Sequence, residues 1–208
     1  MRRLVLLTFL IMCMPLATWA NSSNLVFQNT GGRISIGAGN SLQLTGSTLV
    51  SFSGLNGSII NGTLGSVNFR TGAMTIGTLA MSGSFASGGS FTISGNGTNG
   101  IGTGVLFTGV FSGPVAWVGT YNPAGRNGLG NWMYVLTGNI VGSLSDGSSA
   151  SGGTIQFTFD VPNGQQFSRT VRLNSGITTV TVPEPGTLGL LGTGLLGLAG
   201  IVRRKLRS

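Results

Sequence analysis

The chain has 208 residues, of which only 11 are basic and 3 acidic. The formal charge of +8 comes mostly from the two ends of the chain, because the interior holds five arginines against two aspartates, a net charge of +3. These arginines are spread along the sequence and form no basic run, so we expect no nucleic-acid partner.

Residue types on which enzymes often depend are scarce. The chain has no histidine, and its one cysteine, Cys13, lies in the apolar N-terminal stretch. Ser-His-Asp and Cys-His catalytic groups, and the common zinc and iron sites, need those residues. A glycosidase needs two facing carboxylates. The interior offers only Asp146, in a predicted turn, and Asp160, at a predicted strand end. We therefore expect no enzymatic activity, no metal and no cofactor.

The N-terminal segment, residues 1–20, has the pattern of a secretory signal peptide. Arg2 and Arg3 precede the apolar run Leu4–Met14, and small residues precede a cleavage point after Ala20. The run has 11 residues, which is too short to span a bilayer comfortably. We expect a signal helix that engages the export machinery and is removed by signal peptidase. An uncleaved anchor is the alternative.

The middle of the chain, residues 21–182, is rich in Gly, Ser and Thr and predicts an all-β domain. Most of the 38 glycines fall here, and each interior glycine costs a helix about 1 kcal/mol relative to alanine. Short runs instead alternate apolar and polar residues with the period of two that half-buried strands show. The apolar members of these runs are Ile34, Ile36, Leu42, Leu44, Val67, Phe69, Met74, Ile76, Phe91, Ile93, Ile155, Phe157, Phe159, Val180 and Val182.

Turn-forming dipeptides separate these runs. Asn-Gly and Asp-Gly accept the positive φ angles that tight hairpins require. They occur at Asn56-Gly57, Asn61-Gly62, Asn96-Gly97, Asn127-Gly128, Asp146-Gly147 and Asn163-Gly164. The pattern predicts an antiparallel β-sandwich or barrel. A β-solenoid is the alternative, although residues 31–110 show no fixed repeat.

The stretch Thr120–Val135 is the longest in the domain without clear alternation. It is predicted as an irregular connection that carries Tyr121, Arg126, Trp132 and Tyr134. Aromatic rings beside an arginine could contact a sugar ring or a partner protein. The alternative is that the aromatics belong to the core, as is usual in a small β domain.

The C-terminal segment, residues 183–208, has three parts in order. Pro183-Glu184-Pro185 comes first, and its prolines favour extended backbone before them. An uncharged run over residues 186–202 follows, and as a single transmembrane helix it would measure roughly 25 Å, close to the bilayer core. A basic tail over residues 203–208 ends the chain with Arg203, Arg204, Lys205 and Arg207, which would stay on the cytoplasmic side.

This segment resembles the PEP-CTERM sorting signal of exported bacterial proteins. The resemblance rests on Val182-Pro183-Glu184-Pro185, the apolar run and the basic cluster. It implies recognition by an exosortase, a membrane cysteine transpeptidase that cleaves near Pro-Glu-Pro. It also implies a membrane-anchored precursor in a Gram-negative bacterium that makes exopolysaccharide, and a final place at the cell surface or outside the cell. A plain C-terminal membrane anchor is the alternative.

We therefore expect a non-enzymatic envelope protein with three segments, residues 1–20, 21–182 and 183–208. Its role would be structural, at the cell surface or in an exopolysaccharide matrix. The alternative is a surface module that binds polysaccharide or protein through the Thr120–Val135 region.

Overall fold

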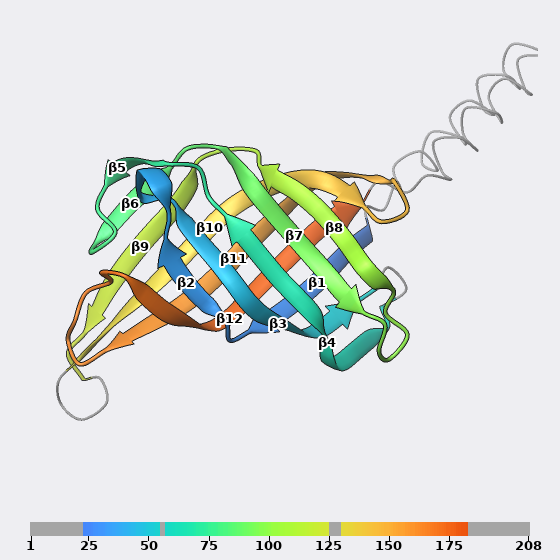
Figure 1. Ribbon diagram of the computed structural model, residues 1–208, viewed down its shortest axis with the longest axis horizontal. Helices are drawn as coiled ribbons and strands as arrows, with labels where there is room; N and C mark the ends of the chain where they lie inside the picture. The colour runs from blue at the N-terminus through green and yellow to red at the C-terminus, as the bar shows by residue number, and fades with distance from the viewer. Residues whose placement is uncertain (1–22, 55–56, 125–129, 183–208) are drawn as a thin grey trace, which may run out of the picture. The chain divides into compact units, whose positions relative to one another are not determined.

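The domain is a closed antiparallel barrel in a computed structural model that describes residues 23–54, 57–124 and 130–182 (Figure 1). Residues Asn24–Val182 form one compact unit. The strands are β1 (Ser23–Thr30), β2 (Arg33–Ile36), β3 (Leu42–Ser53), β4 (Ile59–Arg70), β5 (Met74–Gly77), β6 (Ser82–Phe85), β7 (Gly88–Asn96), β8 (Thr103–Phe111), β9 (Val115–Asn122), β10 (Asn131–Leu144), β11 (Ser149–Pro162) and β12 (Thr170–Val182). A short 3₁₀ turn, Ala38–Asn40, joins β2 to β3.

Eight of these strands form the ring, in the order β2-β3-β4-β7-β8-β10-β11-β12 and back to β2. The other four lengthen it. β1 pairs with β3 beyond β2, β9 pairs with β10 beyond β8, and the β5–β6 hairpin pairs with β9 through β6. Neighbouring strands thus follow one another along the chain, which is the arrangement of an up-and-down barrel. The structure selects the barrel, and the solenoid alternative is wrong.

β1 and β2 act as one long strand with a break between them. Both pair antiparallel with β3, and the break falls at Gly31 and Gly32, whose φ angles are +69° and +77°. A side chain at Gly32 would place its Cβ 2.5 Å from the backbone nitrogen of Ser47. Glycine is therefore required where the strand bends toward β3.

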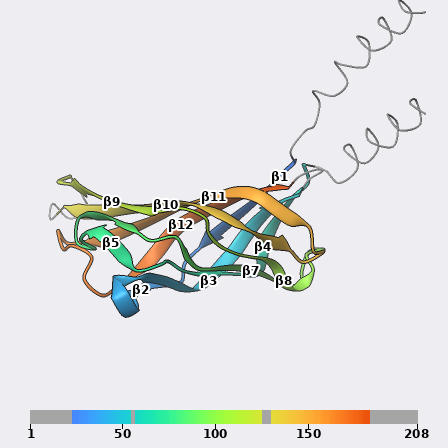
Figure 2. The ribbon, with the colours of Figure 1, turned by 90° about the horizontal axis from the view of Figure 1, so that it is seen from above.

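The barrel is flattened, so that two layers of strands face each other (Figure 2). One layer holds β2, β3, β4, β7 and β8, and the other holds β9 to β12; the strands of the two layers cross in Figure 1. Alternate side chains of both layers point inward and fill the interior. The largest fully buried side chains are Trp117, Tyr134, Phe27, Phe85, Phe91, Phe107, Phe111, Phe157 and Phe159.

The predicted inward faces agree closely with the buried core. The buried members are Ile34, Leu42, Leu44, Val67, Phe69, Phe91, Ile93, Ile155, Phe157, Phe159, Val180 and Val182. Ile36 and Met74 are partly buried against that core. The prediction for Ile76 is wrong, because this side chain is 73% exposed. It lies on β5, a four-residue strand at the edge of the sheet that pairs with β6 alone.

Of three predicted turns, two are formed and one is not. Gly97 and Gly147 have positive φ and stand in the β7–β8 and β10–β11 turns, as expected. Asn61-Gly62 is not a turn, since it lies inside β4 beside a shift of register with β3, and Gly62 has a φ of +139°. The glycine there allows a β-bulge and not a hairpin.

The predicted membrane helix falls outside the described ranges. Among the residues that the structure describes, no helix is long and apolar enough to cross a bilayer. The helices predicted within residues 1–20 and over residues 186–202 lie in segments of which nothing is described.

Candidate functional site

A row of aromatic rings runs from the barrel core to one end of the barrel. Trp117 on β9 stacks on Tyr134 on β10, with ring centroids 4.8 Å apart. Tyr134 stacks in turn on Trp132 at 6.0 Å, and Trp132 contacts Tyr121 at 5.5 Å. Trp117 and Tyr134 are fully buried, whereas Tyr121 is 46% exposed. The row therefore runs from the closed interior to solvent at one end of the barrel. We call this end, where β9 ends and β10 begins, the barrel mouth.

The two buried rings fasten loops to this end of the barrel. Trp117 Nε1 donates a hydrogen bond to the Leu79 carbonyl (2.9 Å), and Tyr134 Oη donates one to the Ala80 carbonyl (2.6 Å). The same Tyr134 oxygen accepts a hydrogen bond from the Phe167 amide (2.9 Å). One hydroxyl thus joins the β5–β6 loop to the β11–β12 loop. Burial raises the pKa of Tyr134, and the hydrogen bond from Phe167 opposes part of that rise.

Tyr121, which is exposed, and Trp132, which is partly buried against the core, form the outer part of the row. They are opposite each other in the β9–β10 register, and their ring planes are inclined by 46°. Gly130 lies beneath Tyr121, because a Cβ at Gly130 would come within 2.3 Å of the Tyr121 hydroxyl. The Tyr121 hydroxyl has no hydrogen-bond partner among the described residues. The pair offers apolar ring faces and one free hydroxyl, which is chemistry suited to a sugar ring.

The predicted contact residues are thus only partly together. Tyr121 and Trp132 are paired at the mouth, Tyr134 is buried with its hydroxyl fully engaged, and Arg126 lies outside the described residues. The prediction that Thr120–Val135 is one irregular connection is wrong. Its two ends are the end of β9 and the start of β10, which form a hairpin. The alternation was hidden because the outward position between the inward rings of Trp132 and Tyr134 is also apolar: it is Met133, which is 40% exposed.

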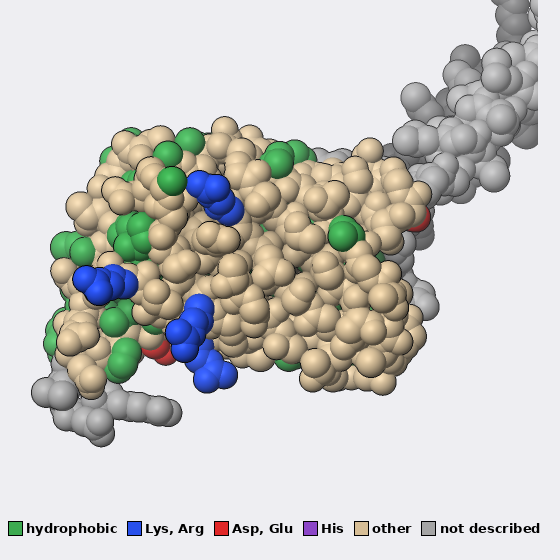
Figure 3. Space-filling model, in the orientation of Figure 1, with side chains coloured by type: hydrophobic (Ala, Val, Ile, Leu, Met, Phe, Trp, Pro, Cys, Tyr) green, Lys and Arg blue, Asp and Glu red, His purple; other side chains and the backbone are tan. Residues whose placement is uncertain are grey.

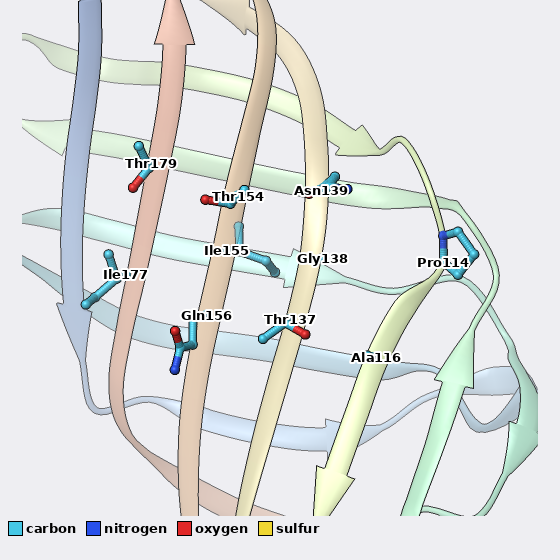
Figure 4. Close-up of a pocket in the computed structure, with 10 residues that line it drawn as sticks. All are labelled: Pro114, Ala116, Thr137, Gly138, Asn139, Thr154, Ile155, Gln156, Ile177 and Thr179. Carbon is cyan, nitrogen blue, oxygen red and sulfur yellow. The ribbon is translucent and has the colours of Figure 1, made fainter.

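A shallow groove crosses the outer face of β10, β11 and β12 (Figure 4). Its volume is about 460 Å³. The side chains that line it are uncharged, and hydroxyl and amide groups predominate: Pro114, Ala116, Thr137, Asn139, Thr154, Gln156, Ile177 and Thr179. This surface was not predicted, because the sequence analysis considered only the apolar residues of each strand. The polar residues that alternate with them, such as Thr154 and Gln156, would have indicated the outer face.

The two aspartates of the domain lie far apart. Asp146 is in the β10–β11 turn, where Ser148 donates backbone and hydroxyl hydrogen bonds to its carboxylate (2.8 and 2.6 Å) and holds its pKa below the usual value. Asp160 is near the other end of β11 and accepts a hydrogen bond from Asn174. Asp160 is eleven positions after Ser149 along extended strand, a span of roughly 36 Å at about 3.3 Å per residue. The two carboxylates cannot meet across one substrate.

No metal site is formed within the described ranges, where no three His, Cys, Asp or Glu side chains gather.

The comparison with protein families identifies the C-terminal segment. A family model described as the PEP-CTERM protein-sorting motif matches residues 181–205. This match confirms the predicted sorting signal, and it implies an exported protein that is sorted at the membrane by exosortase-like machinery. The match begins on Thr181, the second-last residue of β12, and leaves the rest of the barrel unassigned. No curated protein matches the chain.

The position of Tyr134 predicts a structural and not a ligand-binding role. Tyr134→Phe removes the hydroxyl that satisfies both Ala80 and Phe167, so we expect a loss of about 1–3 kcal/mol in the free energy of unfolding. Tyr121→Phe is the matched control, because its hydroxyl has no partner among the described residues, and it should change stability by less than about 0.5 kcal/mol. Urea unfolding of the two purified variants makes the comparison. Equal stabilities would contradict the anchoring role.

Proposed function

We propose that the protein is a non-enzymatic component of the bacterial envelope. The barrel is its surface-exposed part, and the C-terminal segment delivers it. Its role is structural, at the cell surface or in the exopolysaccharide matrix of a Gram-negative cell. The observation that supports this proposal is the direct junction between a self-contained barrel and the sorting motif at the end of β12.

The junction limits where processing can occur without damage to the barrel. Val180 and Val182 are buried in the core, and the Thr181 hydroxyl donates to the Asn24 side chain (3.0 Å). Removal of these residues would open the pairing of the first and last strands. Cleavage on the C-terminal side of Val182 leaves every strand intact, and Pro183-Glu184-Pro185 follows at once.

The composition of the barrel supports a role without catalysis. It has no histidine, and its two aspartates stand at opposite ends of β11. Most outward side chains in the described residues are Ser, Thr, Asn or Gln. Most of the described aromatic side chains are buried in the core. Such a surface is well hydrated and offers hydrogen bonds to sugar hydroxyls without a reactive group.

Intact-mass analysis of the protein from its native host tests the delivery. The mature chain should begin at Asn21 and end within residues 182–186. The barrel needs Val182, and cleavage of the sorting motif is expected near Pro-Glu-Pro. A chain that ends at Ser208, or one that ends before Val180, would contradict the proposal.

A second candidate function is sugar binding at the barrel mouth. The Tyr121–Trp132 pair favours it, with Tyr121 exposed and Trp132 partly buried, since aromatic ring faces can stack on the apolar faces of sugars. Partner-protein binding at the same pair is its variant.

A glycan array tests the second candidate. Tyr121→Ala and Trp132→Ala should each weaken binding about tenfold or more, which corresponds to about 1.4 kcal/mol. Tyr121→Phe keeps the ring and should retain binding. If wild-type protein binds no glycan on the array, or if both alanine variants bind as wild type does, the mouth is not a sugar site.

A further inference from the structure

Four arginines that are distant in the sequence come together on one face of the barrel. Figure 3 shows the basic side chains in one half of that face and none in the other half. All four are exposed, and they lie on or beside β12, β2 and β4: Arg33, Arg70, Arg169 and Arg172. No local pattern predicts this surface, because the four arginines are spread over more than a hundred positions.

The strand register places two of them directly opposite each other. Arg33 and Arg172 are Cα partners across β2 and β12. Partner residues on antiparallel strands have Cα atoms about 4.5–5.5 Å apart, and like charges in that position are destabilising. Arg169 immediately precedes β12. Arg70 lies across from Gln43, whose own partner Ser35 is two residues from Arg33.

Few carboxylates offset this charge. No ion pair forms among the described residues, and no hydrogen bond of the four guanidinium groups is present there. Asp160 lies nearest in register, one residue past the Phe159–Leu173 pair, and its carboxylate accepts a hydrogen bond from Asn174 instead. Asp146 is at the opposite end of β11. The patch therefore keeps a net charge of about +3 in a surface that is otherwise nearly neutral, and it attracts anions.

The surroundings of the arginines indicate the kind of anion. Hydroxyl and amide side chains lie beside them in register, on the same strands or on the neighbouring strands β3 and β7: Ser35, Gln43, Thr45, Ser90 and Thr170. On β12, β2 and β4 the large exposed hydrophobic side chains are Ile59 and Ile177, and each lies five or more residues along its strand from the nearest arginine, so no apolar cluster accompanies the arginines for insertion into a lipid layer. The Tyr121–Trp132 pair belongs to β9 and β10 and offers no base-stacking surface on these strands.

We propose that this arginine patch binds an acidic polysaccharide. Guanidinium groups pair with carboxylates through two parallel hydrogen bonds, and the intervening Ser, Thr and Gln side chains hydrogen-bond to sugar hydroxyls. The proposal rests on the proposed function, since an exported surface protein meets such polymers. β12 runs from Thr170 at the patch to Val182 where the sorting motif follows, roughly 40 Å at about 3.3 Å per residue. The patch is thus remote from the point of attachment.

Binding of the purified protein to polygalacturonate, with neutral dextran as the reference polymer, tests the proposal. Wild-type protein should bind polygalacturonate at least tenfold more tightly than dextran, and the difference should shrink as salt is raised from 0.05 to 0.5 M. Arg33→Gln with Arg172→Gln should weaken binding at least tenfold. Arg33→Lys with Arg172→Lys keeps the charge but cannot form two parallel hydrogen bonds to a carboxylate. Its affinity for polygalacturonate should lie between those of wild type and the double glutamine variant.

The melting temperature separates binding from folding. Removing two facing like charges should leave it unchanged or raise it, so a loss of binding in the glutamine variant cannot be ascribed to unfolding. Equal affinity of wild type for both polymers, or wild-type binding by the glutamine variant, would overturn the proposal. Tighter binding to oligodeoxythymidine or to vesicles of anionic phospholipid would overturn it too and assign the patch to those ligands. Intact-mass analysis tests export and processing independently of this binding experiment. If the protein does not bind polygalacturonate, the proposed delivery to the cell surface is therefore unaffected.

Discussion

The pairing of the last strand with the first two is the contact on which the barrel depends. β12 meets β2 at Thr170–Arg172 and lies beside β1 along the rest of its length. Without this contact, both ends of the sheet would be open edges with unpaired backbone groups, which invite association with other chains. The pairing also joins residues near positions 30 and 175, so the barrel closes only after nearly the whole domain is available. Such long-range closure is slow compared with hairpin formation.

Closure also explains why the sorting segment can follow the barrel without a linker. Because β1 and β12 are neighbours, the chain enters and leaves the domain beside the same seam, where Asn24 and Thr181 share a hydrogen bond. The interior is then occupied by aromatic rings, which leaves the outer surface to carry recognition. That surface is mostly uncharged, with one basic region over β12, β2 and β4.

Much of the fold could be predicted from the sequence. Period-two alternation identified inward residues such as Phe157 and Phe159, and Asp146-Gly147 marked a true turn, because both signals are local. Closure was beyond such reasoning, because no local pattern says that Arg172 will stand opposite Arg33. The exposure of Ile76 at the sheet edge could not be predicted either. Alternation shows which residues share one face of a strand, but not whether another layer of the fold covers that face.

The candidate site was predicted less well, for a related reason. Tyr121, Trp132 and Tyr134 lie within fourteen residues, and they do form one aromatic row. Their different exposures depend on loops contributed by distant segments, since Leu79, Ala80 and Phe167 cover the inner rings. The groove and the arginine patch combine residues from three or more strands each, so only the register assembles them.

A disulfide across the seam tests closure most directly. Ser35 and Thr170 are Cα partners on β2 and β12, within the Cα separation that a disulfide accepts. With Cys13 changed to Ser, Ser35→Cys with Thr170→Cys supplies the only two thiols of the chain. A closed barrel predicts one disulfide within the monomer, seen as a loss of both free thiols while the protein remains monomeric under non-reducing conditions. Ser35→Cys with Thr179→Cys, nine residues further along β12, should keep both thiols free. Two free thiols in the Ser35–Thr170 variant, or linkage only between chains, would contradict a closed barrel.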